Sequence, residues 1–445
     1  MYVFPKNLYT DVRLEDVSVS EITYQNGELR QNLKRNTKGG FIRIFDGKRW
    51  YYSSTTDIDN IQEEINKLAL MANENENILS HPVVEKFEIN KGEYFHFKEN
   101  DILNISQEEK LQLLKSYFPL VENREEIKMW RAIYVDRKIT KEFYSSKGAN
   151  LKFDYQTCAV VYRYSLNIDG KTLDSSYDKT TTDFNKLKNL KEEIEKTISR
   201  DIEYTKHAKP VTPGKYTVIF APIATGVFTH ESFGHKSEAD FMVGDETMMK
   251  EWSIGKKVGA DNLSIVDYGD ILGGGFVPFD DEGTRAKKTY LIKDGILAGR
   301  LHSSVTAESL KEETTGNARA KDFEFEPIVR MTTTYIEAGD KTKEELFSEV
   351  KEGIYIEEIN HGSGMSTFTI APRISYMIRD GKIAEPVNIA VISGNVMETL
   401  YNIDGISNEV ELMSFSLGGC GKFEQFPLPV GFGGPYIRVN NITVQ

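Results

Sequence analysis

The chain has 445 residues, 39% of them hydrophobic and 28% charged, which is the composition of an ordinary globular protein with a sizeable core. Its 68 acidic residues outnumber its 55 lysines and arginines, and the formal charge of −13 argues against binding to nucleic acid or to an anionic membrane, although a local basic groove stays compatible with it. The first seven residues lack the charged and apolar regions of a signal peptide, and no apolar run is long enough to span a bilayer. With two cysteines, Cys158 and Cys420, no disulfide framework is expected, and a reducing cytoplasm fits best.

The first part of the chain mixes strand and helix patterns. Two turn signals, Asp46-Gly47 and Gly148, interrupt strand-like stretches that cover residues 41–52 and 129–166. Residues 207–214 contain two prolines and a glycine, a composition that indicates a loop between domains. Apolar residues at helical spacing predict helices near residues 58–72, 107–118 and 187–202. Because 445 residues exceed what one core usually serves, we expect residues 1–208 to form an N-terminal α+β domain.

The second part is richer in strand patterns and in glycine. Residues 216–220 predict a buried strand, and Asp294-Gly295 and Asp380-Gly381 each predict a hairpin turn. The expected fold class is therefore α+β in two domains, with a mixed sheet-and-helix N-terminal domain followed by a strand-rich domain over residues 209–445.

The sharpest local feature is His230-Glu231-Ser232-Phe233-Gly234-His235, an H-E-x-x-x-H pattern soon after the strand 216–220. Zinc motifs of the H-E-x-x-H type place their histidines at i and i+4 on one helix face. Here the spacing is i+5, which on a regular α-helix separates the two side chains by about 140°. A π-bulge, eased by Gly234, would bring them towards one face. Without such a distortion, both histidines are structural residues that hydrogen-bond locally.

A third metal ligand is available in Gly418-Gly419-Cys420-Gly421, where glycines allow close backbone approach and expose the cysteine. Two neutral imidazoles and a thiolate suit zinc and leave a fourth position open for water. The alternative for Cys420 is a small apolar core residue, since free cysteines are often buried. Cys158 fits that alternative better because it lies in the strand-like segment 155–161.

Several spaced motifs together resemble the TldD/PmbA family of metallopeptidases over nearly the whole chain. The motifs that carry the resemblance are 11–15 (DVRLE), 39–43 (GGFIR), 230–240 (HESFGHKSEAD), 280–283 (DDEG), 315–319 (TGNAR), 393–395 (SGN) and 420–422 (CGK). Their order along the chain makes them more specific than the histidine motif alone.

The resemblance implies that His230, His235 and Cys420 hold a zinc ion and that Glu231 is the general base that activates water. It also implies an α+β fold with a C-terminal catalytic domain that acts on unfolded or flexible polypeptides. Family members of this kind work as dimers, so the expected partner is a second copy of the chain or a paralogue that lacks the metal motif. Because all four motif residues are present, the chain resembles the metal-bearing subunit.

Other polar residues keep two interpretations. Glu238 and Asp240 either orient a ligand histidine or are solvated surface carboxylates. The acidic run 280–282 has three possible roles: it orients a ligand histidine, it binds a substrate amine, or it is a charged turn without a function in the site. Asn317 and Arg319 either hold a substrate carbonyl or carboxylate, or belong to a structural loop.

The remaining histidines and glycines are assigned no chemistry. His302 and His361 lie outside any ligand spacing and are expected to be surface or packing residues. Gly273-Gly274-Gly275 lacks the lysine and following helix of a phosphate-binding loop.

Together these features predict a zinc-dependent metallopeptidase that hydrolyses peptide bonds with Glu231 as general base, without nucleic-acid or membrane partners. Two alternatives stay open: a non-catalytic or regulatory binding partner of another peptidase subunit, and a zinc hydrolase of small-molecule amides.

Overall fold

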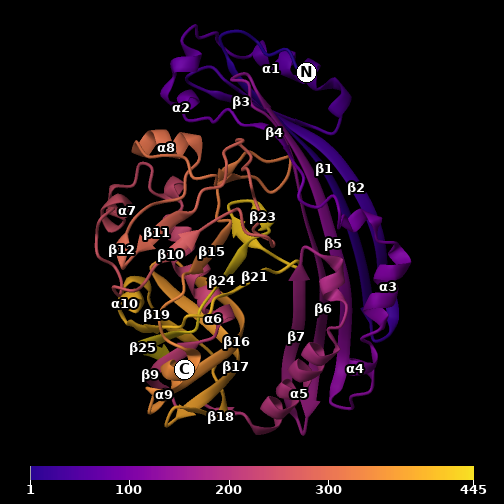
Figure 1. The fold of residues 1–445 in the computed structure, drawn as a ribbon, viewed down its shortest axis with the longest axis vertical. Helices are drawn as coiled ribbons and strands as arrows, with labels where there is room; N and C mark the ends of the chain where they lie inside the picture. The colour runs from indigo at the N-terminus through magenta and orange to yellow at the C-terminus, as the bar shows by residue number, and fades with distance from the viewer. Residues whose placement is uncertain (1) are drawn as a thin grey trace.

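The computed structural model describes residues 2–445, and the long strands of the first part run along one side of the molecule (Figure 1). They form a seven-stranded sheet in the order β3-β2-β1-β5-β6-β4, with β7 paired to β6. The strands are β1 (Tyr9–Gln25), β2 (Glu28–Phe45), β3 (Trp50–Thr55), β4 (Lys91–Tyr94), β5 (Ile127–Ser145), β6 (Asn150–Ile168) and β7 (Lys171–Thr181). The predicted turns at Asp46-Gly47 and Gly148 are confirmed, because Phe45 pairs with Trp50 and Tyr144 pairs with Asn150.

Short helices cover this sheet, and their positions confirm the helical spacing seen in the sequence. Ser106 accepts a hydrogen bond from the backbone N–H of Glu109 at the start of the third helix. Ile194, Ile198 and Ile202 bury one face of the fifth helix in the core of the sheet. The helices are α1 (Ile61–Ala69), α2 (Pro82–Glu85), α3 (Gln107–Lys115), α4 (Pro119–Glu122) and α5 (Lys191–His207).

The second part contains two larger sheets. The eight-stranded sheet has the order β16-β9-β25-β19-β17-β18-β8, with β20 on β25, and it closes on itself because β16 also pairs with β17. Its strands are β8 (Lys209–Pro210), β9 (Gly214–Phe220), β16 (Glu352–Gly364), β17 (Thr367–Arg379), β18 (Lys382–Asn388), β19 (Ile392–Asn395), β20 (Ile403–Ile406) and β25 (Ile437–Val444). Turns at Asp294-Gly295 and Asp380-Gly381 are confirmed, since residues 293 and 296 pair and residues 379 and 382 pair.

The six-stranded sheet has the order β12-β11-β10-β15-β24-β21. Its strands are β10 (Ile265–Asp267), β11 (Thr289–Lys293), β12 (Ile296–Leu297), β15 (Thr333–Ile336), β21 (Glu411–Met413) and β24 (Gly431–Gly434). Two small hairpins are β13 (Ala318–Arg319) with β14 (Ile328–Val329), and β22 (Cys420–Lys422) with β23 (Gln425–Leu428). The helices are α6 (Pro222–Val227), α7 (Glu246–Glu251), α8 (Ser304–Leu310), α9 (Lys343–Ser348) and α10 (Val396–Tyr401).

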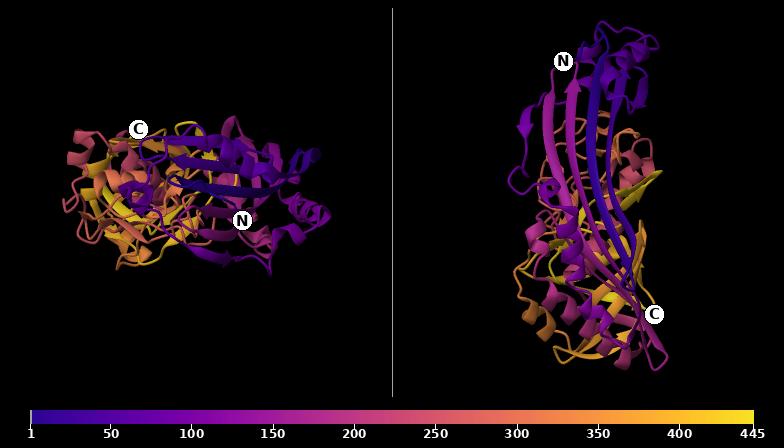
Figure 2. Two further views of the ribbon diagram at one scale, coloured as in Figure 1. Left: turned by 90° about the horizontal axis from the view of Figure 1, so that it is seen from above. Right: turned by 90° about the vertical axis from the view of Figure 1, so that its right-hand side faces the viewer.

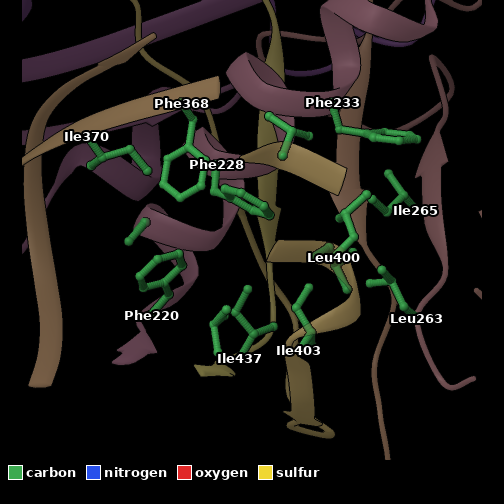
Figure 3. Close-up of a cluster of buried hydrophobic side chains, with 14 of the residues drawn as sticks. Phe220, Phe228, Phe233, Leu263, Ile265, Phe368, Ile370, Leu400, Ile403 and Ile437 are labelled. Atoms are coloured by element: carbon green, nitrogen blue, oxygen red, sulfur yellow. The ribbon is translucent and has the colours of Figure 1, made fainter. Parts of the chain in front are cut away.

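The core of the second part lies between these sheets and holds the histidine motif in place (Figure 3). Phe228 and Phe233 flank His230 in sequence and are fully buried. Phe228 packs edge-on against Phe220 of β9 and against Phe368 of β17, with ring centroids 6.1 and 5.0 Å apart. The motif is therefore anchored by two strands of the eight-stranded sheet and not carried on an exposed loop.

Charged and aromatic side chains join the long sheet to the second part, which lies against it (Figure 2). Lys141 of β5 pairs with Asp281 at 2.5 Å, and Arg43 of β2 pairs with Glu282 at 3.0 Å. All four side chains are buried, so these ion pairs are screened from water. Phe279 packs in one apolar cluster with residues of β5 and β6.

We propose residue 208 as the boundary between two domains. Every strand of the long sheet ends by Thr181, and α5 ends at His207. The loop predicted at 207–214 also contains the two-residue strand β8, whose Pro210 pairs beside β18 at the edge of the sheet, where a missing N–H is tolerated. Among residues 2–445, no helix is both long enough and apolar enough to cross a membrane.

Candidate metal centre

The histidine motif lies on a π-helical segment, Phe228–Gly234, that continues α6. Pro222 begins α6 directly after β9, which confirms that the motif follows the strand on a helix. The backbone N–H of His235 donates to the carbonyl of His230, the i→i+5 hydrogen bond of a π-helix. It brings the two imidazole rings to a centroid separation of 5.2 Å. The distortion expected from the i+5 spacing is therefore confirmed.

Gly234 has a different role from the one expected. Its φ of −57° is ordinary helical backbone, so no left-handed conformation demands a glycine there. A β-carbon at this position would overlap the sulfur of Met331, so the glycine is needed for close packing of the segment against the core.

Cys420 joins the two histidines from the start of β22. Its Sγ lies 3.4 Å from Nε2 of His235, and the ligating atoms of His230, His235 and Cys420 all lie within 4.8 Å of one another. Gly419, with a φ of +151°, allows this approach, because a β-carbon there would sit 2.5 Å from the carbonyl oxygen of Leu428. Cys158 is buried in the core of the long sheet, as predicted.

The three residues fit a zinc ion. Nδ1 of His230 is buried and has no hydrogen-bond partner within residues 2–445, so this imidazole has a nitrogen that no other protein group uses. Imidazole nitrogens and a thiolate are the donor types that zinc prefers, and three protein ligands are typical of a site with an open position.

Charges and hydrogen bonds among the candidate ligands shift the pKa values of Cys420 and His235. Burial raises the pKa of the Cys420 thiol, but the charges and hydrogen bonds of His230 and His235 outweigh it and lower the pKa to about 4. Burial lowers the pKa of His235, whereas hydrogen bonds to Cys420 and Glu238 raise it to about 10. Cys420 is thus a thiolate at neutral pH, which is the form that binds metal.

Glu238 orients His235 from behind and is not a solvated carboxylate. It is fully buried, and its Oε2 lies 3.3 Å from Nδ1 of His235. Burial raises the pKa of Glu238, but the hydrogen bond to His235 and the charge of Lys422 lower it, so the carboxylate is ionised. An N–H at Nδ1 that donates to this carboxylate would leave Nε2 to face a metal ion that displaces the Nε2 proton.

Lys422 completes this arrangement, and the sequence interpretation missed it. Its Nζ lies 3.0 Å from Glu238 and 2.6 Å from Asp240, and it donates to the carbonyl of Val329 at 2.8 Å. The available signal was its position two residues after Cys420, because residues i and i+2 of a strand share one face.

A cavity of about 200 Å³ opens beside the metal ligands and is called the metal pocket below. It is lined by Val227, His230, Glu231, Ile359, Asn360, His361, Gly362, Phe415, Gly419, Cys420, Val430 and Phe432. His361, predicted to be a surface or packing residue, is exposed in this wall, whereas His302 is buried and binds Glu312 at 2.9 Å. The pocket therefore presents Glu231 and two of the three candidate ligands, His230 and Cys420, to one solvent-accessible space with an apolar wall.

The other motif residues lie in structural contacts outside the metal pocket. Asp280 accepts backbone N–H groups of residues 282, 284 and 318, while Asp281 and Glu282 form the ion pairs to the long sheet described above. Arg319 donates to the carbonyls of residues 331 and 429, and Asn317 donates to Asp267. The structural interpretation of these residues therefore fits their contacts.

Comparison with known proteins agrees with this geometry. Residues 213–445 match the family described as PmbA/TldA metallopeptidase C-terminal domain, and residues 10–75 match domain 1 of the same family. A metalloprotease of Synechocystis, slr0863, is 32% identical, and the match covers 98% of this chain and 94% of the relative. The chain belongs to the PmbA/TldD metallopeptidase family.

Other family members match over a similar span. Metalloprotease MJ0996 of Methanocaldococcus jannaschii is 30% identical over 97% of this chain and 95% of the relative. A protein named zinc metalloprotease TldD homolog from Saccharolobus solfataricus is 29% identical, and the match covers 98% of this chain and 96% of the relative. TldE from Thermococcus kodakarensis has the same fold, with a TM-score of 0.76 at 17% identity, over 98% of this chain and 96% of that one.

Replacing Cys420 by serine is expected to remove most of the zinc from this PmbA/TldD protein, because a neutral hydroxyl replaces a thiolate ligand. Elemental analysis of the unchanged protein should give about one zinc per chain, since one complete ligand set is present. Cys158→Ser is the matched control and should keep its zinc. Full occupancy in Cys420→Ser would exclude Cys420 from the site.

Replacing Glu238 by glutamine is expected to weaken zinc affinity roughly 10–100-fold, because an amide does not hold the Nδ1 proton of His235 as a carboxylate does. Competition with a chromogenic chelator measures the affinity. Glu246→Gln, in the exposed first turn of α7, is the control and should bind zinc as the unchanged protein does. Equal affinities in both variants would show that Glu238 does not position His235.

Proposed function

We propose that this chain is a zinc-dependent peptidase that hydrolyses peptide bonds in unfolded or flexible polypeptides. The observation that carries the proposal is the meeting of His230, His235 and Cys420, with ligating atoms within 4.8 Å of one another, beside a pocket that His230, Cys420 and Glu231 line. Relatives of near-full length named as metalloproteases support the reaction, and one named as a zinc metalloprotease supports the metal.

Each residue of the centre has a separate role in this proposal. The two imidazoles and the thiolate would hold the zinc, which when bound lowers the pKa of a water ligand to about 7 and polarises a substrate carbonyl. Glu231 accepts the proton of the attacking water and passes it to the nitrogen of the leaving amine. Because a thiolate donates more charge than an imidazole, such a zinc ion is a weaker Lewis acid than one held by histidines alone.

An extended peptide segment is the substrate form that the pocket favours. Strand β16 pairs with β9 only from Ile354 to Ile356, whereas its residues 359–362 line the metal pocket. The edge of β16 beyond Ile356 can therefore pair with a peptide backbone beside Glu231, a mode that depends little on side-chain identity. A hydrolase of small amides has no need of such an edge, and a non-catalytic subunit has no need of Glu231 beside a full ligand set.

Glu231→Gln tests the reaction directly. The variant is expected to keep its zinc and lose activity about 10²–10⁴-fold, because an amide cannot accept the proton of the attacking water. Hydrolysis of an unstructured peptide, followed by mass spectrometry, measures the loss, and Glu246→Gln is the matched control. Activity within a few-fold of the unchanged protein would remove Glu231 from the mechanism.

Unfolded chains are expected to be cut and folded proteins spared. A folded loop has to open locally before it can lie along β16, and such opening costs free energy up to the global stability of the substrate. The test compares cleavage of one substrate protein in its native form and in a destabilised variant. Equal rates would contradict this picture, and hydrolysis of small amides alone would favour the amide-hydrolase alternative.

We further propose a dimer, formed either by two copies of this chain or with a paralogue that lacks the metal motif. Phe423 and Phe426 of the β22–β23 hairpin are 74% and 58% exposed, as expected of residues that a partner covers. Light scattering should give a dimer at micromolar concentration for the chain alone or after addition of the paralogue. A monomer with full peptidase activity would contradict the proposal.

A further inference from the structure

A second cavity, of about 480 Å³, lies between the long sheet and strands β16 and β17, which face β6 and β7 in Figure 1. It is called the arginine cavity here because Arg131 of β5, Arg163 of β6 and Arg373 of β17 line it. Asn360 of β16 lines both this cavity and the metal pocket, so the two spaces adjoin. A peptide that extends along β16 from Glu231 therefore passes towards the three guanidinium groups.

The register of the long sheet places two of these arginines directly opposite each other. Gln25 pairs with Arg131, Arg131 with Arg163, and Arg163 with Ser176, which gives one continuous row across four strands. Like charges directly opposite on neighbouring strands destabilise a sheet. The repulsion between Arg131 and Arg163 therefore lowers the stability of the sheet, and a bound anion would reduce this repulsion.

Neither arginine of this pair has an ion-pair partner in the described part of the chain. Among residues 2–445, no carboxylate lies within salt-bridge distance of Arg131 or Arg163, and Arg131 donates only to the side-chain oxygen of Gln25, at 3.4 Å. Both side chains are exposed to the cavity. In a chain with a net charge of −13, two such arginines side by side form a local positive patch.

The acidic groups around the cavity already have partners. Asp174 accepts a hydrogen bond from Ser165 at 2.5 Å, and Asp178, diagonal to Arg163, accepts one from Thr180 at 2.9 Å. Glu358 accepts from Nη2 of Arg373 at 3.1 Å. The neutral hydroxyls leave the charges of Asp174 and Asp178 in place, and burial raises the pKa of Asp178 while the charge of Arg163 lowers it, but neither carboxylate lies within salt-bridge distance of the opposed pair.

Arg373 of β17 lies across the cavity from the row. Its Nη1 donates to Oγ of Ser176 at 2.8 Å, and its buried Nε has no hydrogen-bond partner within residues 2–445. Its side chain is 11% exposed, so the guanidinium is held in a fixed orientation at the edge of the space. A planar guanidinium with a free N–H matches a carboxylate better than a lysine ammonium does.

We propose that the arginine cavity binds a carboxylate of the peptide whose backbone lies in the metal pocket. This inference rests on the proposed peptidase function and adds a substrate class to it: peptides with an acidic group at a set distance from the scissile bond. The carboxylate belongs either to an aspartate or glutamate side chain or to the C-terminus of the peptide. Both sources offer the same two oxygens to Arg131 and Arg163.

A set of matched peptides distinguishes the two sources. The parent is a neutral, unstructured peptide with an amidated C-terminus; one series carries a single glutamate at successive positions, and another peptide has a free C-terminus. Binding is measured by fluorescence anisotropy with zinc-loaded Glu231→Gln protein, and cleavage with the unchanged enzyme. We expect one glutamate position, or the free C-terminus, to bind about 10–100-fold more tightly than the parent, as charged hydrogen bonds allow, and raised salt to reduce the difference.

Variants of the row test the assignment of the site. In Arg131→Gln/Arg163→Gln, the ratio of acidic to neutral peptide affinity should fall to near one. Arg30→Gln is the matched control, because Arg30 lies on the same sheet but is paired with Glu28 outside the cavity. Reversal of both charges, Arg131→Glu/Arg163→Glu, should transfer the preference to a peptide with lysine at the same position, a result that a misfolded variant would not give.

The outcomes separate this proposal from the peptidase proposal. Peptide cleavage without any preference for a carboxylate, or a preference that survives the double glutamine variant, would overturn the carboxylate site alone. A carboxylate preference in binding without cleavage of any peptide would support the site and overturn the peptidase.

Discussion

The hydrogen bond from the backbone N–H of His235 to the carbonyl of His230 is the constraint on which the candidate centre depends. With regular α-helical geometry, histidines five residues apart diverge by about 140° and cannot share a metal. A π-helical turn is an unfavourable local conformation, so the surrounding core has to hold it. Phe228 and Phe233, both fully buried, fix its two ends, and the missing side chain of Gly234 lets the turn lie against Met331.

The other half of the centre comes from the β22–β23 hairpin, which supplies the thiolate and the support for a histidine together. Cys420 and Lys422 lie on the same face of β22, and Lys422 holds Glu238 in place behind His235. A small displacement of this hairpin would move one ligand and the support of a second at the same time. The geometry of the centre thus depends on a few buried polar contacts between segments that are distant in sequence.

Local sequence patterns predicted those features that local interactions determine. Asp46-Gly47, Asp294-Gly295 and Asp380-Gly381 gave correct hairpins, and the i+5 spacing of His230 and His235 gave a correct π-helical turn. The glycines around Cys420 and the preference of zinc for a thiolate made Cys420 a candidate third ligand, and the family resemblance implied the same role.

Features that depend on tertiary contacts were not accessible in the same way. Lys422 contacts Asp240 across 182 residues of sequence, and Lys141 contacts Asp281 across 140, so neither pair has a local signature. His361 was expected to be a surface or packing residue because no ligand spacing includes it, and it is exposed, but its place in the wall of the metal pocket follows from the irregular pairing of β16 with β17. Arg131 and Arg163 are 32 residues apart, and only the register of β5 against β6 makes them neighbours.

The wide separation of the ligands also determines when the centre can exist. His235 and Cys420 are 185 residues apart in the chain, and every strand from β10 to β21 lies between them. A polypeptide that ends within this interval, through early termination or proteolysis, contains both imidazoles but no thiolate and no Lys422. Two histidines without a thiolate make a much weaker zinc site, so the hydrolytic centre would assemble only after the intervening sheets have been synthesised and folded. Incomplete chains of this protein would thus lack the proposed peptidase activity.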